Sequence, residues 1–337
     1  MRGHLGCQHA HRRVLPTPST RLRALVTGAT GFVGRHLVEH LVAEGDEVVA
    51  TGRSTGGPDL LNTEGIGDLL NEVHPEVVFH LAGQADVAHS WTEPVKTFRT
   101  NGEGTFNLLS AAREVGVDRV VTIISSDVYG LVPSEDLPVA EDAPFRPNSP
   151  YAVSKAMADL VAQQAHLGFG QDVIRARPFS HFGAGQGENA VCSALAARVA
   201  RSELDDSGVI RVGNLHAKRD FTNVRDVVRS YRLLAVQGQA GSAYNVCTGI
   251  STSIGTVLDV FLSHTERPLR VVSDPALFRP VDLSELFGDG TRIEEDTGWS
   301  PQCSLESGLL ELLNDWRYRL RQVGVGSPES QIVKDRS

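Results

Sequence analysis

At 337 residues, the chain is long enough for one large domain or two domains of ordinary size. Hydrophobic residues make up 41% and charged residues 22%, as in ordinary soluble globular proteins. The formal net charge of −9 argues against broad nucleic-acid binding, which needs excess positive charge to neutralise phosphates. Because no stretch has the length and apolar character of a transmembrane helix or a signal segment, we expect a cytoplasmic protein without a membrane partner.

The cysteines and the N-terminal histidines predict no metal site. The four cysteines lie far apart, at Cys7, Cys192, Cys247 and Cys303. They form neither a CxxC pair nor the spacing of a zinc site, so we expect reduced thiols. His4, His9 and His11 flank Cys7 in a polar segment, which is more typical of a solvated tail than of a metal site.

Residues 22–179 alternate short β-rich runs with longer helical patterns, which predicts an α/β domain with a doubly wound parallel sheet. The expected strands are residues 24–28, 47–52, 77–83, 119–126 and 172–179. Their high Val, Ile and Leu content is typical of strands that are buried on both faces. The expected helices are residues 34–44, 96–115 and 151–167.

The second half has a less regular pattern. Gly183, Gly185 and Gly187 mark a loop, after which shorter strand-like and helical pieces alternate. We expect residues 180–321 to form most of a smaller, mixed substrate domain, with segments such as residues 244–246 returning to the main sheet. Residues 1–21 and 322–337 are expected to be flexible tails.

A glycine-rich loop follows the first expected strand. The sequence ALVTGATGFVGRHL places Gly28, Gly31 and Gly34 between a strand and an amphipathic helix. A tight first turn, close backbone approach and a helix N-terminus together favour the pyrophosphate of a dinucleotide cofactor. A glycine-rich turn without a ligand is the alternative, but the order strand, loop, helix and strand argues against it.

The end of the second strand bears on the choice of cofactor. Enzymes that use NAD usually carry an acidic residue there, whereas this chain has Arg53, whose guanidinium suits a 2′-phosphate. NADP(H) is therefore favoured, and NAD(H) stays open. Asp59 and Leu60 open the next segment and are candidates to hold the adenine, although Asp59 also fits an ordinary turn.

A tyrosine and a lysine lie four residues apart in SPYAVSKAM, on one face of an expected helix. A hydride delivered to a carbonyl carbon leaves charge on the oxygen, which then needs a proton donor. We expect Tyr151 to be that donor, with Lys155 lowering the pKa of the phenol and Ser125 donating a hydrogen bond to the same oxygen. The alternative is a capping serine, a core tyrosine and a surface lysine.

The motifs TGATGFVG, SSDVYG and YAVSK, in this order, resemble those of the extended short-chain dehydrogenase/reductase family. HLAGQADV, RPFSHFGAGQ, VGNLHAKRDFTNVRDVV, YNVCTG, FRPVDLSELFGD and TGWSP look most like GDP-6-deoxy-4-keto-mannose reductases and their GDP-mannose 4,6-dehydratase relatives. The resemblance runs from about Arg23 to Arg319. It implies a Rossmann domain with a C-terminal nucleotide-sugar domain, and a homodimer.

The resemblance also implies roles for individual residues. The catalytic triad would be Ser125, Tyr151 and Lys155. The cofactor would be bound by Gly28, Gly31, Phe32, Val33, Gly34, Leu81, Ala82 and Gly83, with Arg177 near the nicotinamide. The sugar nucleotide would contact Gln84, Ser126, Asp127, Arg219, Arg279 and Asp282, with Ser180 beside it.

Three departures from the family pattern bear on the reaction. Ser180 replaces the usual Asn and Ala184 the usual Pro, which leaves the base and the hexose open between GDP- and dTDP-linked sugars. Dehydratases carry Glu where this chain has Asp127, which is one methylene shorter than the carboxylate that takes the carbon-5 proton. We therefore expect an NAD(P)H-dependent 4-ketoreductase of a nucleotide-activated 4-keto-6-deoxyhexose, serving natural-product or polysaccharide biosynthesis.

Three alternatives remain. A 4,6-dehydratase or a 4-epimerase would share the same site, and the epimerase is disfavoured by Arg53. A nonenzymatic sensor of NADP would share the fold, but such sensors typically lack the pair formed by Tyr151 and Lys155.

Overall fold

The computed structural model describes residues 21–205, 208–265, 268–278 and 283–325. Its larger part is built on a six-stranded sheet in which every neighbouring pair is parallel, in the order β2-β1-β3-β4-β5-β9. The strands are β1 (Arg23–Thr27), β2 (Glu47–Thr51), β3 (Val77–His80), β4 (Arg119–Ile123), β5 (Val173–Pro178) and β9 (Ala243–Val246). The doubly wound α/β class predicted from the sequence is confirmed.

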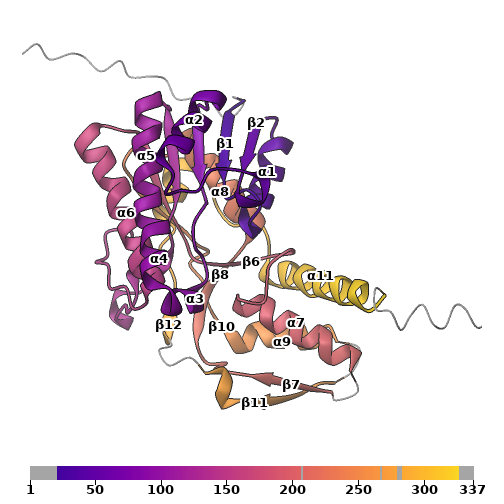
Figure 1. The fold of residues 1–337 in the computed structure, drawn as a ribbon. Helices are drawn as coiled ribbons and strands as arrows, with labels where there is room; N and C mark the ends of the chain where they lie inside the picture. Colours follow the sequence, from indigo (N-terminus) through magenta and orange to yellow (C-terminus); the bar gives the residue numbers. More distant parts are fainter. Residues whose placement is uncertain (1–20, 206–207, 266–267, 279–282, 326–337) are drawn as a thin grey trace, which may run out of the picture.

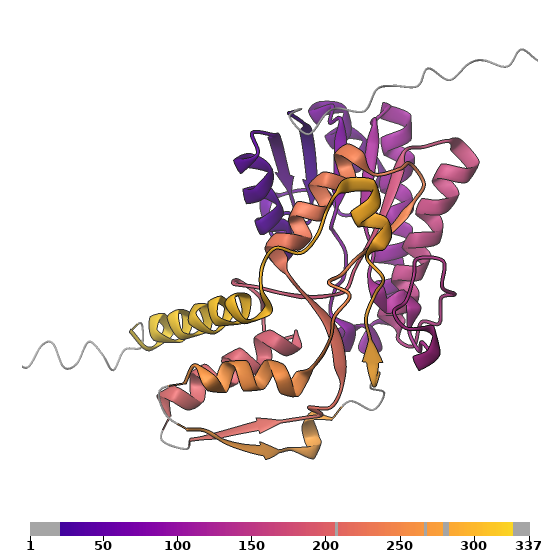
Figure 2. The same ribbon diagram turned by 180° about the vertical axis from the view of Figure 1, so that it is seen from behind.

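Helices cover both faces of this sheet, as Figures 1 and 2 show from opposite sides. Val26 and Phe79 pack in one core cluster, whereas Leu25 and Val78 pack in another, because successive strand residues point to opposite faces. The first cluster is closed by α1 (Phe32–Ala43) and α8 (Val224–Gln237). The second is closed by α2 (Thr63–Val73), α5 (Gly104–Val115) and α6 (Pro150–Phe169).

The helix expected over residues 96–115 is interrupted. It consists of α4 (Pro94–Phe98), a π-helical turn η2 (Arg99–Glu103) and α5, and it follows the short helix α3 (Val87–Thr92). Within η2, Asn101 is buried and its side chain bonds outside its own helix. A π-turn adds a residue to the helical repeat, and such turns are frequent at functional sites.

The second half forms a smaller lobe beside the main sheet (Figure 1). Its strands are β6 (Ser180–Phe182), β7 (Val209–Val212), β8 (Lys218–Asn223), β10 (Ser251–Ser253), β11 (Arg270–Ser273) and β12 (Glu285–Leu286). Its helices are α7 (Val191–Leu204), α9 (Ile254–Ser263) and α11 (Leu305–Val325), which share one core cluster. Helix α11 continues past residue 321, so the first residues of the expected C-terminal tail are helical.

Two segments of the second half belong to the main domain. β9, which contains residues 244–246, pairs with β5, and α10 (Thr291–Thr297) packs against α8 and β9. The short helical turns are η1 (Arg53–Thr55), η3 (Ser126–Tyr129), η4 (Ser134–Asp136) and η5 (Pro275–Leu277). Among the described helices, none combines the length and the apolar character that a membrane span requires.

Candidate active site

The glycine loop follows β1 and leads directly into α1. Gly28 has φ +69°, and a Cβ placed there would lie 2.7 Å from the backbone nitrogen of Ala82. A Cβ at Gly34 would lie 2.2 Å from the carbonyl oxygen of Gly28. Larger residues at these positions would force the loop apart, so the loop is a tight cradle that presents backbone and the N-terminus of α1 to a ligand. This arrangement fits the pyrophosphate of a dinucleotide.

A cavity of about 1430 Å³ extends from this loop into the smaller lobe. It exceeds the range of about 300–1,000 Å³ that is usual for one small ligand. The predicted cofactor residues that line it are Gly28, Gly31, Phe32, Val33, Gly34, Arg53, Asp59, Leu60, Leu81, Ala82 and Gly83. A single continuous space therefore has room for a dinucleotide and a second ligand.

Arg53 begins η1, directly after β2, and its side chain is exposed at the wall of the cavity. Asp59 lies nearby and accepts a hydrogen bond of 2.9 Å from the backbone nitrogen of Leu61, which is a turn contact. An exposed guanidinium that lines the cavity is suited to meet a 2′-phosphate, whereas Asp59 also serves its own loop.

Ser125, Tyr151 and Lys155 all line the same cavity. Tyr151 and Lys155 lie in the first turns of α6, which begins at Pro150 after the capping side chain of Ser149. Ser125 follows β4, and its Oγ accepts a 3.2 Å hydrogen bond from the nitrogen of Asp127, so it caps η3. Ser125 therefore caps a helical turn, which was the alternative interpretation of this serine. Its side chain also forms a hydrogen bond with Tyr151.

The pKa of Tyr151 differs from the expectation. Burial raises the pKa of the Tyr151 phenol, the carboxylate of Asp127 raises it further, and a hydrogen bond with Ser125 opposes both effects. The expected lowering by Lys155 is wrong: Lys155 is not among the groups that shift this pKa, and desolvation of a phenolate outweighs the hydrogen bond with Ser125. A phenol with a raised pKa is protonated at neutral pH, which is the form that a proton donor requires.

Lys155 is buried, and its Nζ donates a 2.8 Å hydrogen bond to the carbonyl oxygen of Ile123 at the end of β4. Burial lowers the pKa of Lys155 to about 8. The neighbouring His80 has a pKa lowered to about 3 by burial and by Lys155, so it is neutral. Lys155 is therefore a cation at neutral pH that can lose its charge in the mildly alkaline range.

Of the residues predicted to contact or adjoin the sugar nucleotide, Ser126, Asp127, Ser180 and Arg219 line the cavity. Arg219 is half-buried on β8, and its Nη1 donates to the carbonyl oxygens of Lys218 and Leu283 at 2.7 and 2.8 Å. These bonds hold the guanidinium in a residue that lines the cavity. Arg279 and Asp282 lie outside the described residues.

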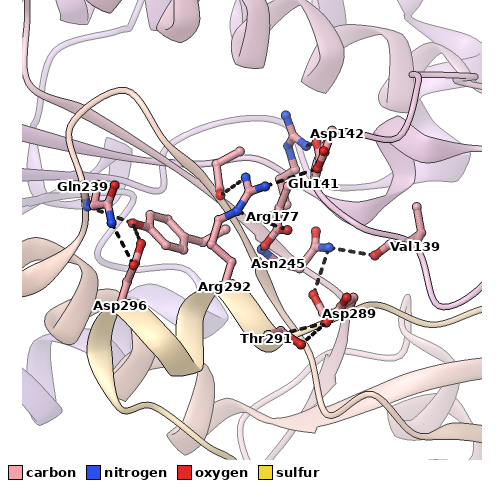
Figure 3. Close-up of polar contacts among 12 residues, drawn as sticks. Val139, Glu141, Asp142, Arg177, Gln239, Asn245, Asp289, Thr291, Arg292 and Asp296 are labelled. Atoms are coloured by element: carbon pink, nitrogen blue, oxygen red, sulfur yellow. Dashed lines mark hydrogen bonds and ion pairs between the residues drawn. The ribbon is translucent and has the colours of Figure 1, made fainter.

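Arg177 does not line the cavity, so the prediction that it lies near the nicotinamide is wrong. Its guanidinium is 3% exposed and forms two hydrogen bonds with the carboxylate of Asp159, at 2.7 and 3.1 Å. It also donates to the hydroxyl of Tyr129 and the carbonyl of Glu141. Figure 3 shows Arg177 in the polar network that joins Glu141 to Asn245. Its buried charge is paired there, so its role is structural.

Gln84 is also not among the residues that line the cavity, although Gly83 and Ala85 on either side are. Its backbone nitrogen and oxygen bond the side chain of Asn101 at 2.8 and 2.9 Å, and its Nε2 donates to the carbonyl of Asp86. Its Oε1 is buried without a partner among the described residues, and the contact with the hexose stays a prediction. Asn101 also donates to Ser154, next to Lys155.

Asn101 was not predicted from the sequence. This side chain fastens the segment after β3 to α6, and a Cβ at Gly83 would lie 2.8 Å from its Oδ1. The signal was weak, because an asparagine inside a helical pattern gives no indication of a π-turn or of distant partners. In the described residues, no group of three or more His, Cys, Asp or Glu side chains could hold a metal ion.

Comparison with known proteins agrees with this geometry. Residues 25–312 match the family model of GDP-mannose 4,6 dehydratase. The chain is 36% identical over 302 residues to the GDP-6-deoxy-D-mannose reductase of Pseudomonas aeruginosa, covering 89% of this chain and 99% of the relative. The solved structure of RMD from Pseudomonas aeruginosa, complexed with NADPH, matches with a TM-score of 0.81 and 35% identity over 88% of this chain and 99% of that one. MoeE5, in complex with UDP-glucose and NAD, matches with a TM-score of 0.78 and 32% identity, covering 88% and 99% of the two chains.

Proposed function

This chain belongs to the GDP-mannose 4,6 dehydratase family of extended short-chain dehydrogenases/reductases, and on that premise we propose that it is an NAD(P)H-dependent 4-ketoreductase. Its substrate is a nucleotide-activated 4-keto-6-deoxyhexose. The observation that carries the proposal is the single cavity, which brings the glycine loop, the pair Tyr151 and Lys155, and Arg219 into one space. The product, an activated 6-deoxyhexose, would supply the synthesis of a polysaccharide or of a glycosylated natural product such as an antibiotic.

The cofactor would be held by the glycine loop and by backbone at Leu81, Ala82 and Gly83, and it would supply the hydride to carbon 4 of the sugar. Tyr151 gives its phenolic proton to the oxygen at carbon 4, and Ser125 donates a hydrogen bond to that oxygen. The cation of Lys155 stabilises the phenolate left behind until a proton from solvent restores it. One hydride and one proton thus convert the ketone to an alcohol.

Arg219 supports the sugar-nucleotide end of the proposal. Its guanidinium is fixed at the cavity wall by two backbone carbonyls and can give charge-assisted hydrogen bonds to a diphosphate. In a chain with a net charge of −9, such local cations must supply the attraction for an anionic substrate. The 36% identity to a GDP-6-deoxy-D-mannose reductase favours a GDP sugar over a dTDP sugar.

The 4,6-dehydratase is the second candidate, since the family model is that of a dehydratase. Asp127 lies close enough to Tyr151 to raise its pKa, so a carboxylate is near the reaction centre. However, a carboxylate one methylene shorter than Glu has a shorter reach toward carbon 5. Reduction needs only the hydride donor and Tyr151, so the ketoreductase needs fewer aligned groups.

The cofactor is proposed to be NADP(H), on the basis of Arg53 after β2 and of the NADPH complex of a relative. A 2′-phosphate would gain a charge-assisted contact from the exposed guanidinium.

A homodimer is proposed from an exposed apolar patch on neighbouring helices α4, α5 and α6. The patch consists of Val95, Phe106, Met157, Leu160 and Leu167, which are 39% to 75% exposed. Exposed apolar clusters of this kind mark interaction surfaces, and a second copy of the same helices would cover them symmetrically.

Turnover with defined sugar nucleotides tests the proposed function. The purified protein is given GDP- and dTDP-linked 4-keto-6-deoxyhexoses with NADPH or NADH, and cofactor oxidation is followed by absorbance. We expect oxidation that depends on the keto sugar nucleotide. Absence of oxidation with every combination would rule out a 4-ketoreductase.

A further inference from the structure

Tyr231 is a buried tyrosine that lines the cavity and whose hydroxyl forms no hydrogen bond within the described residues. It lies on α8 with 0% exposure, and its side chain contributes to the cavity lining. Within the part of the chain that the structure describes, its Oη has no hydrogen-bond partner. A buried hydroxyl without a partner is costly, so such a group in a cavity wall points to a ligand that completes it.

The other core tyrosines sharpen this contrast. The hydroxyl of Tyr129 donates to Asn245 at 2.7 Å, and that of Tyr244 donates to Asp296 at 2.6 Å. Tyr244 shares a core cluster with Tyr231 and is also 0% exposed, but its hydroxyl points to α10 and not into the cavity. Tyr129 and Tyr244 thus have hydrogen-bonded hydroxyls and do not line the cavity, whereas Tyr231 lines it and has an unpaired hydroxyl within the described residues.

The position of Tyr231 indicates which ligand group it meets. Helix α8 covers one face of the main sheet, whereas α6, which carries Tyr151, covers the other. The two phenols nevertheless line the same cavity, and Tyr231 belongs to the core cluster against which Ile123 packs, the residue whose carbonyl oxygen binds Lys155. Burial and Tyr151 both raise the pKa of Tyr231, so its hydroxyl is a protonated donor. In a doubly wound sheet, a dinucleotide binds in the crevice at the carboxyl ends of the strands.

We propose that the Tyr231 hydroxyl donates a hydrogen bond to the carboxamide oxygen of the nicotinamide ring. It is a positioning contact that fixes the orientation of the ring beside Tyr151. This inference rests on the proposed function, because it requires a nicotinamide cofactor in this cavity. No residue of the sugar-nucleotide end is involved.

The test compares two ligands that differ in the nicotinamide. Calorimetry measures the dissociation constants of NADPH and of 2′-phospho-ADP-ribose for the unmodified protein, for Tyr231→Phe and for the control Tyr244→Phe, with NADH and ADP-ribose alongside. Tyr231→Phe should weaken the binding of the nicotinamide-bearing ligand about threefold to tenfold, the scale of one hydrogen bond. Binding of the ribose fragment should stay unchanged, and Tyr244→Phe should change neither constant.

Three other outcomes can be told apart. Equal weakening of both ligands, or of neither, in Tyr231→Phe would overturn the contact and leave the proposed function standing. Failure of the unmodified protein to bind NADPH and NADH would overturn both proposals. Without any ligand, the melting temperature of Tyr231→Phe should equal or exceed that of the unmodified protein, because the substitution removes an unpaired buried hydroxyl. A marked fall would show that the hydroxyl has a structural partner and would also overturn the inference.

Discussion

Lys155 Nζ donates a 2.8 Å hydrogen bond to the carbonyl oxygen of Ile123, the last residue of β4. This bond anchors the buried ammonium at the carboxyl edge of the sheet, in the cavity that Tyr151 also lines. The charge of this ammonium depends on a pKa that burial has lowered to about 8. The charge of the site in the mildly alkaline range therefore depends on Lys155.

The pH dependence of reduction should follow this lysine. Lys155 is charged below its pKa of about 8 and neutral above it, whereas Tyr151, with its raised pKa, stays protonated throughout. We expect kcat/KM to be level between about pH 6 and 7.5 and then to fall, approaching about tenfold per pH unit. A variant Lys155→Arg keeps its charge at high pH, so its residual activity should lack this fall. A profile of the unmodified enzyme that is level to pH 10 would contradict the assignment.

Replacement of the proposed proton donor should affect turnover and not binding. Tyr151→Phe should lower kcat by at least about a hundredfold, because a general acid contributes on this scale. The dissociation constant of the cofactor should change little. Tyr244→Phe is the matched control, since its hydroxyl bonds Asp296 outside the cavity. Near-normal turnover in Tyr151→Phe would remove this residue from the mechanism.

Arg53 determines the preference between the two cofactors in this account. Arg53→Asp should raise the Michaelis constant for NADPH about tenfold or more and that for NADH much less, because a carboxylate repels the 2′-phosphate. Arg270→Asp, which changes an exposed arginine on β11, controls for the change in net charge. Equal shifts for both cofactors in Arg53→Asp would show that this arginine does not read the phosphate.

Disruption of the apolar patch should convert the proposed dimer to a monomer. Leu160 is 54% exposed on α6. In the variant Leu160→Glu, each copy would bury an unpaired carboxylate at the symmetric interface, which is unfavourable. Sedimentation at micromolar concentration should give a dimer for the unmodified protein and a monomer for Leu160→Glu. Val42→Glu alters a residue of similar exposure on α1, outside the patch, and should leave the dimer intact. A monomeric unmodified protein would contradict the proposal.

The local features of the site were predictable, and the long-range ones were not. The glycine loop lies within one strand–loop–helix unit, and Tyr151 and Lys155 lie four residues apart on one helix. Local backbone geometry alone therefore brings the residues of each group together. Arg177 lies in a motif next to the site, but its guanidinium forms an ion pair with Asp159 on α6. No local sequence pattern indicates this tertiary contact. The same holds for Asn101, whose partners Gln84 and Ser154 lie on other elements.

The reduction itself tests the central claim most directly. The purified protein is incubated with NADPH and GDP-4-keto-6-deoxymannose, and in parallel with oxidised cofactor and GDP-mannose, and the sugar nucleotides are analysed by mass spectrometry. The account predicts that the keto sugar gains two hydrogens, with NADPH consumed in equal amount, and that GDP-mannose remains unchanged. Loss of water from GDP-mannose, without net consumption of cofactor, would contradict the reductase assignment and identify a dehydratase.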